Sequence, residues 1–306
     1  MQHQTAGDPI TGLKWTRKTT EKIAAELQSL GLSVSASTVG RLLREMGFSL
    51  RVNHKKIAGS GPDRNQQFEY IGRMKDRFSL KGAPIVSVDT KKKELVGNFK
   101  NPGAAWNQEP VRVNDHDYPS MADGVAHPYG ILDLTANRGS VFVGTSSDTA
   151  EFAVEALERW WRNDGRRTYP NADHVLVLAD GGGSNGFRNR AWKVFLQEKL
   201  CDRHEISVTV CHYPTGTSKW NPVEHRLFSE ISKNWAGQPL DSYETILKYI
   251  RTTRTATGLT VKASLINRSY ETGIKISDAE MATLSLRCHE TQPKRNYTLK
   301  PRKNGK

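Results

Sequence analysis

Five consecutive apolar residues, Val175-Leu176-Val177-Leu178-Ala179, place the strongest restriction on how this chain can fold. A strand built from them has no polar face, so it must lie inside a sheet that is covered on both sides. The run ends at Asp180, which a glycine-rich stretch follows. We therefore expect an α/β domain with this strand near its centre.

The segments around this strand predict a regular order of elements. Residues 85–88 form a short apolar strand, and residues 95–99 are interpreted as its hairpin partner. Further strands are predicted at 129–134, 141–144 and 206–210, and helices at 149–162, 190–199, 223–235 and 242–256. Hairpin-linked strands followed by helix, strand, helix, strand, helix are the order of a ribonuclease-H-like domain, with a mixed five-stranded sheet flanked by helices.

The N-terminal part has a different pattern, which is typical of a winged helix-turn-helix. Apolar residues recur at helical spacing from Ile23 to Leu30, and Gly31 ends that helix. A second helix is predicted at 36–46, with Val39, Leu42, Leu43 and Met46 facing inward, and an alternating strand at 48–52. The second helix would expose Ser37, Arg41 and Arg44, which suit contacts with DNA. The alternative is a small helical domain with a solvated basic face.

These patterns divide the chain into four parts. We expect a winged helix-turn-helix module at 1–60 and a connecting helix at 61–82, with Gly59-Ser60-Gly61 as the linker at their boundary. The ribonuclease-H-like domain would occupy 83–257, and a loosely patterned C-terminal extension 258–306. The last residues, 294–306, carry six basic residues and no acidic one, so we expect a flexible tail that touches DNA.

The overall charge favours a polyanionic partner. The chain has 45 Lys and Arg against 32 Asp and Glu, a net charge of +13, and such charge drives binding to nucleic-acid phosphates. A basic enzyme without such a partner is the alternative. No apolar run is long enough for a membrane span. The three cysteines form no CxxC pair, which predicts a reduced cytoplasmic protein without structural zinc.

Three acidic residues lie at strand ends or at a helix start, where their carboxylates could form a metal site. Asp89 and Asp180 end two strands that are parallel neighbours in the predicted topology, and Glu224 begins a helix. Clustered carboxylates suit Mg²⁺ or Mn²⁺, and two such ions about 3.5–4 Å apart can promote cleavage of a phosphodiester. Glu224 also has a structural explanation: with Asn221 as N-cap and Pro222 at N1, it would fall at N3 of a capping box.

The sequence around these acids has a known counterpart. The blocks are Ser87-Val88-Asp89-Thr90-Lys91-Lys92-Lys93-Glu94, Asp180-Gly181-Gly182-Gly183-Ser184-Asn185-Gly186 and Lys219-Trp220-Asn221-Pro222-Val223-Glu224-His225. They resemble bacterial insertion-sequence DDE transposases, most of all the Rhodopirellula-type group allied to mariner-like enzymes. The likeness runs from the helix-turn-helix to about Lys262, and Asn-Pro-Val-Glu is its most specific part.

The resemblance implies metal-dependent DNA strand cleavage and strand transfer of an insertion sequence. It implies that Asp89, Asp180 and Glu224 are the catalytic residues and hold two Mg²⁺ or Mn²⁺ ions. The expected partners are double-stranded DNA, as terminal inverted repeats and target DNA, and a second copy in a homodimer, at the bacterial nucleoid. Such transposases often carry a further N-terminal helical module, so a truncated copy is expected.

Several alternatives stay open at this stage. Asp133 and Glu230 are rival metal ligands, while His212 and His225 are candidates for proton transfer or for plain hydrogen bonding. Lys91, Lys92 and Lys93 form either a solvated turn or a contact with the DNA backbone. The glycines after Asp180 either let the backbone approach a phosphate or form an ordinary loop. The function could also be that of a nuclease on the same fold, or of a DNA-binding protein derived from a transposase.

Overall fold

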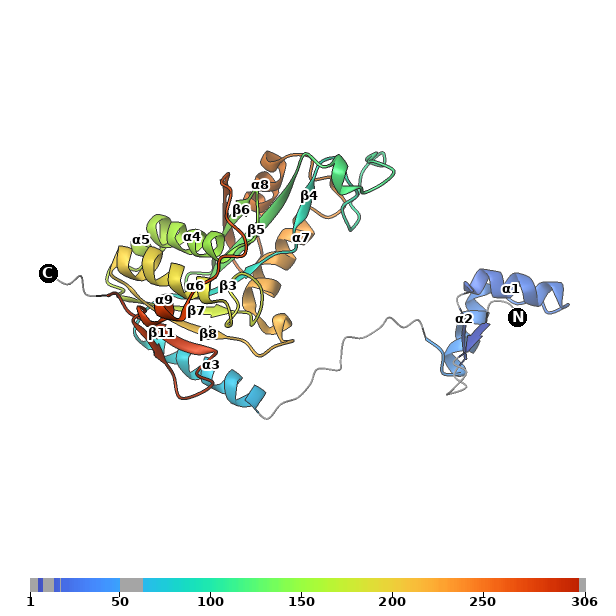
Figure 1. Cartoon of the computed structure of the whole chain (residues 1–306). Helices are drawn as coiled ribbons and strands as arrows, with labels where there is room; N and C mark the ends of the chain where they lie inside the picture. The colour runs from blue at the N-terminus through green and yellow to red at the C-terminus, as the bar shows by residue number, and fades with distance from the viewer. Residues whose placement is uncertain (1–4, 8–13, 17, 50–62, 303–306) are drawn as a thin grey trace. The chain divides into compact units, whose positions relative to one another are not determined.

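The computed structural model describes residues 5–7, 14–16, 18–49 and 63–302. The chain divides into two compact units, Met1–Ala58 and Gly59–Lys306 (Figure 1). Among the described residues, no helix has both the length and the apolar character needed to cross a membrane.

Two short helices form the main part of the first unit. Its elements are β1 (Thr5–Gly7), β2 (Lys14–Thr16), α1 (Thr20–Ser29) and α2 (Ala36–Glu45), with β1 and β2 antiparallel. Each helix begins at a hydroxyl N-cap: the side chain of Thr19 accepts from the amide of Lys22, and that of Ser35 from the amide of Thr38. Both helices lie where the sequence predicts them. Most of the strand predicted at 48–52, from residue 50 on, and the linker at 59–61 lie outside the described residues.

The apolar side chains of α2 are less enclosed than predicted. In the described part of this unit, Ile23 and Val39 are buried, whereas Leu42 is 40% and Met46 70% exposed. Two ten-residue helices bury one row of side chains where they meet, so the flanking positions stay at the surface. The expectation that Leu42 and Met46 face inward is therefore wrong for this unit.

A mixed sheet forms the centre of the second unit. Its strands are β3 (Ile85–Thr90), β4 (Glu94–Val96), β5 (Gly124–Asp133), β6 (Arg138–Gly144), β7 (His174–Ala179), β8 (Ser207–His212), β9 (Thr260–Ile266), β10 (Leu286–Cys288) and β11 (Asn296–Leu299). Their order in the sheet is β10-β11-β8-β7-β3-β5-β6-β9, and β4 pairs with β5 outside this path. The pairs β3–β7, β7–β8 and β6–β9 are parallel, and the other pairs are antiparallel.

The hairpin predicted between residues 85–88 and 95–99 is not formed. The partner of β3 on this side is β5, and β4 pairs with the beginning of β5, where Leu95 lies opposite Val125. The ten residues of β5 extend beyond the end of β3, so their free edge can take β4 as a second partner.

The described sheet has nine strands and not the five predicted, because β4 joins it beside β5 and the C-terminal segment contributes three more strands. β9 extends the sheet beside β6, while β11 pairs with β8 and β10 with β11. The sheet thus continues beyond the boundary predicted at residue 257. The prediction of a flexible tail at 294–306 is also wrong up to residue 302, because Asn296–Leu299 is buried in the sheet. Of this segment, residues 303–306 lie outside the described residues.

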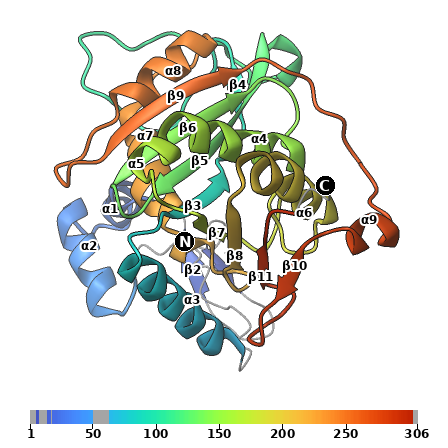
Figure 2. The same ribbon diagram turned by 90° about the vertical axis from the view of Figure 1, so that its left-hand side faces the viewer.

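Helices cover both faces of the sheet (Figures 1 and 2). The α-helices are α3 (Asp63–Leu80), α4 (Ala150–Trp160), α5 (Arg166–Thr168), α6 (Arg190–Phe195), α7 (Ser229–Asn234), α8 (Tyr243–Thr252) and α9 (Asp278–Ala282). Shorter turns are the 3-10 helices η2 (Pro119–Met121) and η5 (Ser218–Trp220) and the π-helical η3 (Trp161–Gly165), η4 (Leu196–Asp202) and η6 (Glu224–Phe228).

The packing explains the apolar run of β7. Val175 and Val177 belong to the core on the side of α4 and α6, while Leu176 and Leu178 pack on the side of α3. A separate core under α7 and α8 covers the sheet near β5, β6 and β9. Both faces of β7 are therefore enclosed, as the sequence predicts.

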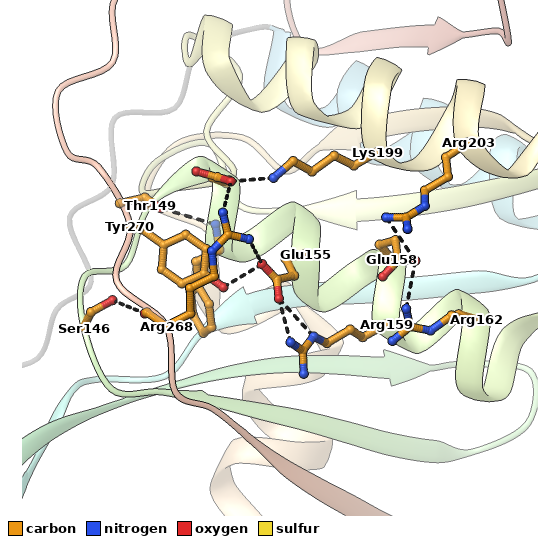
Figure 3. A network of polar contacts seen from close by, with 12 residues as sticks. Ser146, Thr149, Glu155, Glu158, Arg159, Arg162, Lys199, Arg203, Arg268 and Tyr270 are labelled. Carbon is orange, nitrogen blue, oxygen red and sulfur yellow. Dashed lines mark hydrogen bonds and ion pairs between the residues drawn. The ribbon is translucent and has the colours of Figure 1, made fainter.

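A polar network holds the segment after β9 against α4 (Figure 3). Arg268 forms ion pairs with Glu151 (2.9 Å) and Glu155 (2.8 Å), and Tyr270 donates to Glu155 (2.9 Å). Ser146, just before α4, donates to the backbone oxygen of Arg268 (2.8 Å). This network fixes the loop that leads into α4.

Candidate active site

Asp89 and Asp180 lie beside each other at one edge of the sheet. β3 and β7 are parallel, with Val88 opposite Ala179, so the next residue of each strand reaches the same edge. Both side chains are partly buried. The amide of Thr90 donates to Oδ1 of Asp89 at 2.8 Å, which fixes one oxygen of that carboxylate.

Glu224 reaches this edge through contacts between the η5–η6 segment and β3. Ser87 accepts a hydrogen bond from the amide of Val223 (3.0 Å) and donates to Oδ1 of Asn221 (2.5 Å). Ser87 and Asn221 are buried. The start of the η6 turn is thereby attached to the strand that carries Asp89.

The predicted capping role of Asn221 is wrong. Its amide nitrogen donates to the backbone oxygen of Val88 (3.2 Å) and lies 3.5 Å from Oδ2 of Asp89. At the start of η6 no side chain forms a cap hydrogen bond. The cap is absent because the Asn221 side chain is bound to β3, while the first amides of this segment have other acceptors: that of Val223 donates to Ser87 and that of Glu224 to the backbone oxygen of Asn221. Glu224 is thus not part of a capping box.

The three carboxyl groups repel one another. Burial, followed by the charges of Asp180 and Glu224, raises the pKa of Asp89 to about 8. Burial also raises the pKa of Asp180, whereas a hydrogen bond from the Asn221 side-chain amide lowers it. The pKa of Glu224 is raised by burial and by the charge of Asp180, and lowered by the charge of Lys91. These groups therefore lie within electrostatic reach of one another.

One carboxylate oxygen of Asp180 lacks a hydrogen-bond partner in the described part of the chain, which points to a cation as the group that would reduce this repulsion. Its Oδ1 atom is buried and has no hydrogen-bond partner within the described residues. An unpaired buried polar atom costs about 1–3 kcal/mol, and more when the group is charged. The described residues contain no ready-made cluster of three His, Cys, Asp or Glu side chains for a metal ion. A divalent cation at Asp180 would nevertheless satisfy the free oxygen and reduce the repulsion.

The two rival ligands are engaged elsewhere. Asp133 accepts from the amides of Thr135 (3.0 Å) and Ala136 (2.9 Å) and from the hydroxyl of Tyr169 (2.9 Å). Glu230 pairs with Lys233 at 2.6 Å. Neither residue is among the causes of the pKa shifts of Asp89, Asp180 and Glu224.

The two histidines differ in their surroundings. His212 is buried, with Nδ1 2.9 Å from the backbone oxygen of Arg295 and Nε2 2.8 Å from that of Asn185. Burial lowers its pKa to about 4. His225 is exposed and close enough for its charge to lower the pKa of Glu224.

The side chains predicted to contact DNA differ in their exposure and in their contacts within the protein. Lys91 is held by Glu94 (2.5 Å) and lies over the ring of Trp235, whereas Lys92 and Lys93 are exposed. On α2, Arg41 pairs with Glu45 (2.5 Å), and Nε of Arg44 donates to the backbone oxygen of Gly40 (2.9 Å). Ser37 is within hydrogen-bond distance of Ser35 (2.7 Å).

The glycines after Asp180 shape a compact loop. Gly183 has a φ of +72°, and a side chain on Gly186 would come within 3.0 Å of the backbone of Gly182. A side chain at Gly186 is therefore excluded by the packing of the loop on itself. Beside the loop lies a cavity of about 540 Å³, lined by Asp180 and by Arg188.

Sequence reasoning missed a fourth acid near this edge. Asp148 accepts from the hydroxyl of Thr90 at 3.1 Å, and its charge contributes to the raised pKa of Asp89. Asp148 directly precedes Thr149, the N-cap of α4. A sequence of Ser-Ser-Asp-Thr before a helix is typical of a helix start, so it carried no signal of proximity to Asp89.

Comparison with known proteins identifies the family of this chain. A family model described as Rhodopirellula transposase DDE domain matches residues 1–301. The chain is similar to the Mos1 transposase in its paired-end complex with the left transposon end, with 19% identity and a TM-score of 0.46 over 76% of this chain and 65% of that one. For a pre-cleavage Mos1 transpososome the identity is 18% and the TM-score 0.45, over 76% of this chain and 66% of the other. The chain thus spans about two thirds of these proteins or slightly less. No curated protein matches the sequence.

Proposed function

Because this chain belongs to the Rhodopirellula transposase DDE-domain family, we propose that it is a DDE transposase, which cuts the DNA strands of an insertion sequence and transfers them to target DNA. The observation that supports this most is the unpaired, buried Oδ1 of Asp180 beside two further carboxyl groups with raised pKa. The similar solved structures include paired-end complexes of the Mos1 mariner transposase with Mn and with Mg.

We assign Asp89, Asp180 and Glu224 as the residues that hold two Mg²⁺ or Mn²⁺ ions. Oxygen ligands are the ones these ions prefer. Bound ions would activate the attacking water or 3′-hydroxyl and stabilise the leaving oxygen of the phosphodiester. Lys91 lies near Glu224, where its charge favours the ionised carboxylate needed for a ligand.

Asn221 acts in this proposal as a positioning residue. Its amide group lies next to Asp89 and lowers the pKa of Asp180, so it favours the ionised form of the latter. Through Ser87 it also joins the start of η6 to β3. A single side chain thereby keeps the segment of Glu224 in register with the two aspartates.

DNA would reach this edge along the loop after Asp180. Arg188 lines the cavity there, and the side chain of Arg295 lies 3.3 Å from where a Cβ of Gly181 would stand. Small residues at 181–183 let a phosphodiester approach Asp180 without a steric barrier. We assign end recognition to the N-terminal helices, with Ser37, Arg41 and Arg44, and backbone contacts to Lys91, Lys92 and Lys93, with two copies acting as a homodimer.

The deciding experiment uses the full chain and a duplex that carries the ends of its own element. We expect nicking in Mg²⁺ or Mn²⁺ and none in EDTA, followed by joining of the freed 3′ end to a second duplex. Nicking without joining would identify a nuclease on the same fold. Specific binding without nicking would identify a DNA-binding protein derived from a transposase.

A further inference from the structure

The second unit contains a strongly basic groove far from the carboxylates. It is a hollow of about 650 Å³ between α3, the beginnings of β7 and β8, and the β10–β11 pair. Five exposed cationic residues line it: Arg73, Arg77, Lys81, Arg287 and Lys300. We call these five residues and the hollow the basic groove. His174 begins β7 and lines the groove, whereas Asp180 follows the other end, so roughly 20 Å of strand separates the two sites.

The charges of the groove are not neutralised within the protein. Within the described part of the chain, none of the five cationic side chains forms an ion pair. The only acidic residues in the lining are Asp173 and Glu290. The cationic charges reach the same groups. After burial, and against the opposing charge of Asp173, those of Lys81, Arg77 and Lys300 lower the pKa of His174, and after burial those of Arg287 and Arg77 lower the pKa of His289. A bound anion would therefore be favoured here.

A chain of hydroxyl and imidazole groups forms the floor of the groove. The hydroxyl of Thr209 lies 2.8 Å from Nε2 of His174 and 2.7 Å from the hydroxyl of Thr298. Nε2 of His289 lies 2.8 Å from the same Thr298 hydroxyl, and its Nδ1 lies 2.6 Å from the hydroxyl of Tyr70. These groups belong to β7, β8, β11 and α3 and to the residue after β10, so hydrogen bonds join the elements that surround the groove.

The cations are arranged in a row. Arg73 and Arg77 are one turn apart on α3, and Lys81 follows one turn later, just after the helix. At 1.5 Å per residue, the row is about 12 Å long. A single phosphate cannot span this length, whereas successive phosphates of a DNA strand can contact several cations of the row. Arg287 and Lys300 lie across the groove from this row.

We propose that the basic groove binds the sugar–phosphate backbone of duplex DNA, at a second contact remote from the carboxylate edge. The inference rests on the proposed function for the identity of the polyanion. The groove would hold DNA beyond the cleavage point, by charge and without base recognition.

Cys288 provides a native reporter of occupancy. It lines the groove and is exposed, whereas the other two cysteines of the chain, Cys201 and Cys211, are buried. In the wild-type chain, alkylation of Cys288 by N-ethylmaleimide should slow several-fold when a saturating duplex is added. Inorganic phosphate at matched ionic strength should have little effect. Equal protection by phosphate, or by polyglutamate, would overturn the proposal in favour of a free-anion site or an acidic protein partner.

A pair of matched variants separates the groove from the total charge. Lys81→Gln with Lys300→Gln should remove the DNA protection of Cys288 and lower the log–log salt slope of DNA binding by up to about 1.8, at about 0.9 per phosphate contact. Lys248→Gln with Lys275→Gln removes the same charge from exposed positions outside the groove lining and should leave the protection unchanged. Equal behaviour of the two double variants would overturn the proposal.

The result is independent of the cleavage test. If the wild-type chain cleaves DNA but duplex protects Cys288 equally well in both double variants, the groove proposal fails and the transposase proposal stands. If groove-dependent protection is found without any Mg²⁺-dependent cleavage, the groove proposal stands and the catalytic one fails. Thermal unfolding of all variants checks that the exposed substitutions leave the fold intact.

Discussion

At the scale of single residues, Glu224 is the position where a structural role and a catalytic role give different expectations. Glu224→Gln should reduce Mg²⁺-dependent cleavage more than about 100-fold, beyond the range usual for residues that only support a ligand. Stability in EDTA should not fall, because burial and Asp180 already disfavour the charged Glu224. Cleavage and thermal unfolding measured on one preparation test both points, with Glu230→Gln as control. A Gln variant that cleaves at the wild-type rate contradicts the assignment.

Asn221 and Ser87 provide a second residue-scale prediction. Ser87→Ala leaves the amide of Val223 and Oδ1 of Asn221 without this partner. The free energy of unfolding should therefore fall by about 1–3 kcal/mol. Cleavage should fall about 10–100-fold, as for other residues that orient ligands. Urea unfolding with Ser79→Ala, an exposed serine, as control measures the first effect. A silent Ser87→Ala variant would show that η6 is held without this hydroxyl.

His174 gives the chain a defined pH dependence. Burial lowers its pKa to about 4 in the folded state, below the usual 6.5. Between these values the unfolded chain binds a proton that the folded chain does not, so stability is lost as pH falls below about 6.5. The loss contributed by His174 should stay below about 1.4 kcal/mol per pH unit, because its ring is partly exposed to solvent. Denaturant unfolding of His174→Gln and wild type from pH 7 to 5 should give a flatter curve for the variant, and parallel curves would contradict this.

At the scale of elements, β11 is the strand that joins β8 to the outermost strand, β10. Tyr297 is buried, and its hydroxyl accepts from Nε1 of Trp192 at 3.0 Å. Tyr297→Ala should therefore cost about 3–5 kcal/mol, as for other large aromatic side chains in a core. Tyr118→Ala, at an exposed position, is the control. Thermal unfolding of the variants measures the difference, and equal values would mean that β11 is not part of the core.

At the scale of the whole molecule, the two units are expected to divide DNA binding between them. Arg41→Ala with Arg44→Ala should abolish discrimination between element ends and random duplex, while binding to random DNA through the second unit remains. Competition binding measures the ratio, with Lys248→Ala and Lys275→Ala as a control of equal charge. Unchanged discrimination would mean that end recognition belongs to other residues.

The sequence by itself determined the features that local patterns encode. The apolar run of β7 required burial on both faces, and parallel strands ending in Asp89 and Asp180 predicted that these acids share one edge. The family resemblance is confirmed by the match over residues 1–301. These features could be predicted because strand burial and strand-end position follow from residues that are neighbours in the chain.

Tertiary structure decided what depends on contacts between distant segments. The extension of the sheet by β9, β10 and β11 was not predicted. β10 and β11 have only three and four residues and carry little periodic signal, whereas β9 does alternate between exposed and buried residues, but its pairing with β6 is a contact between distant segments. Asn221 looked like a helix cap, yet its side chain is bound to β3, more than 130 residues away along the chain. Asp148 was hidden in a helix start, and the row of cations on α3 meets Arg287 and Lys300 only because β10 and β11 pack beside it. Such juxtapositions arise from packing, which no local pattern records.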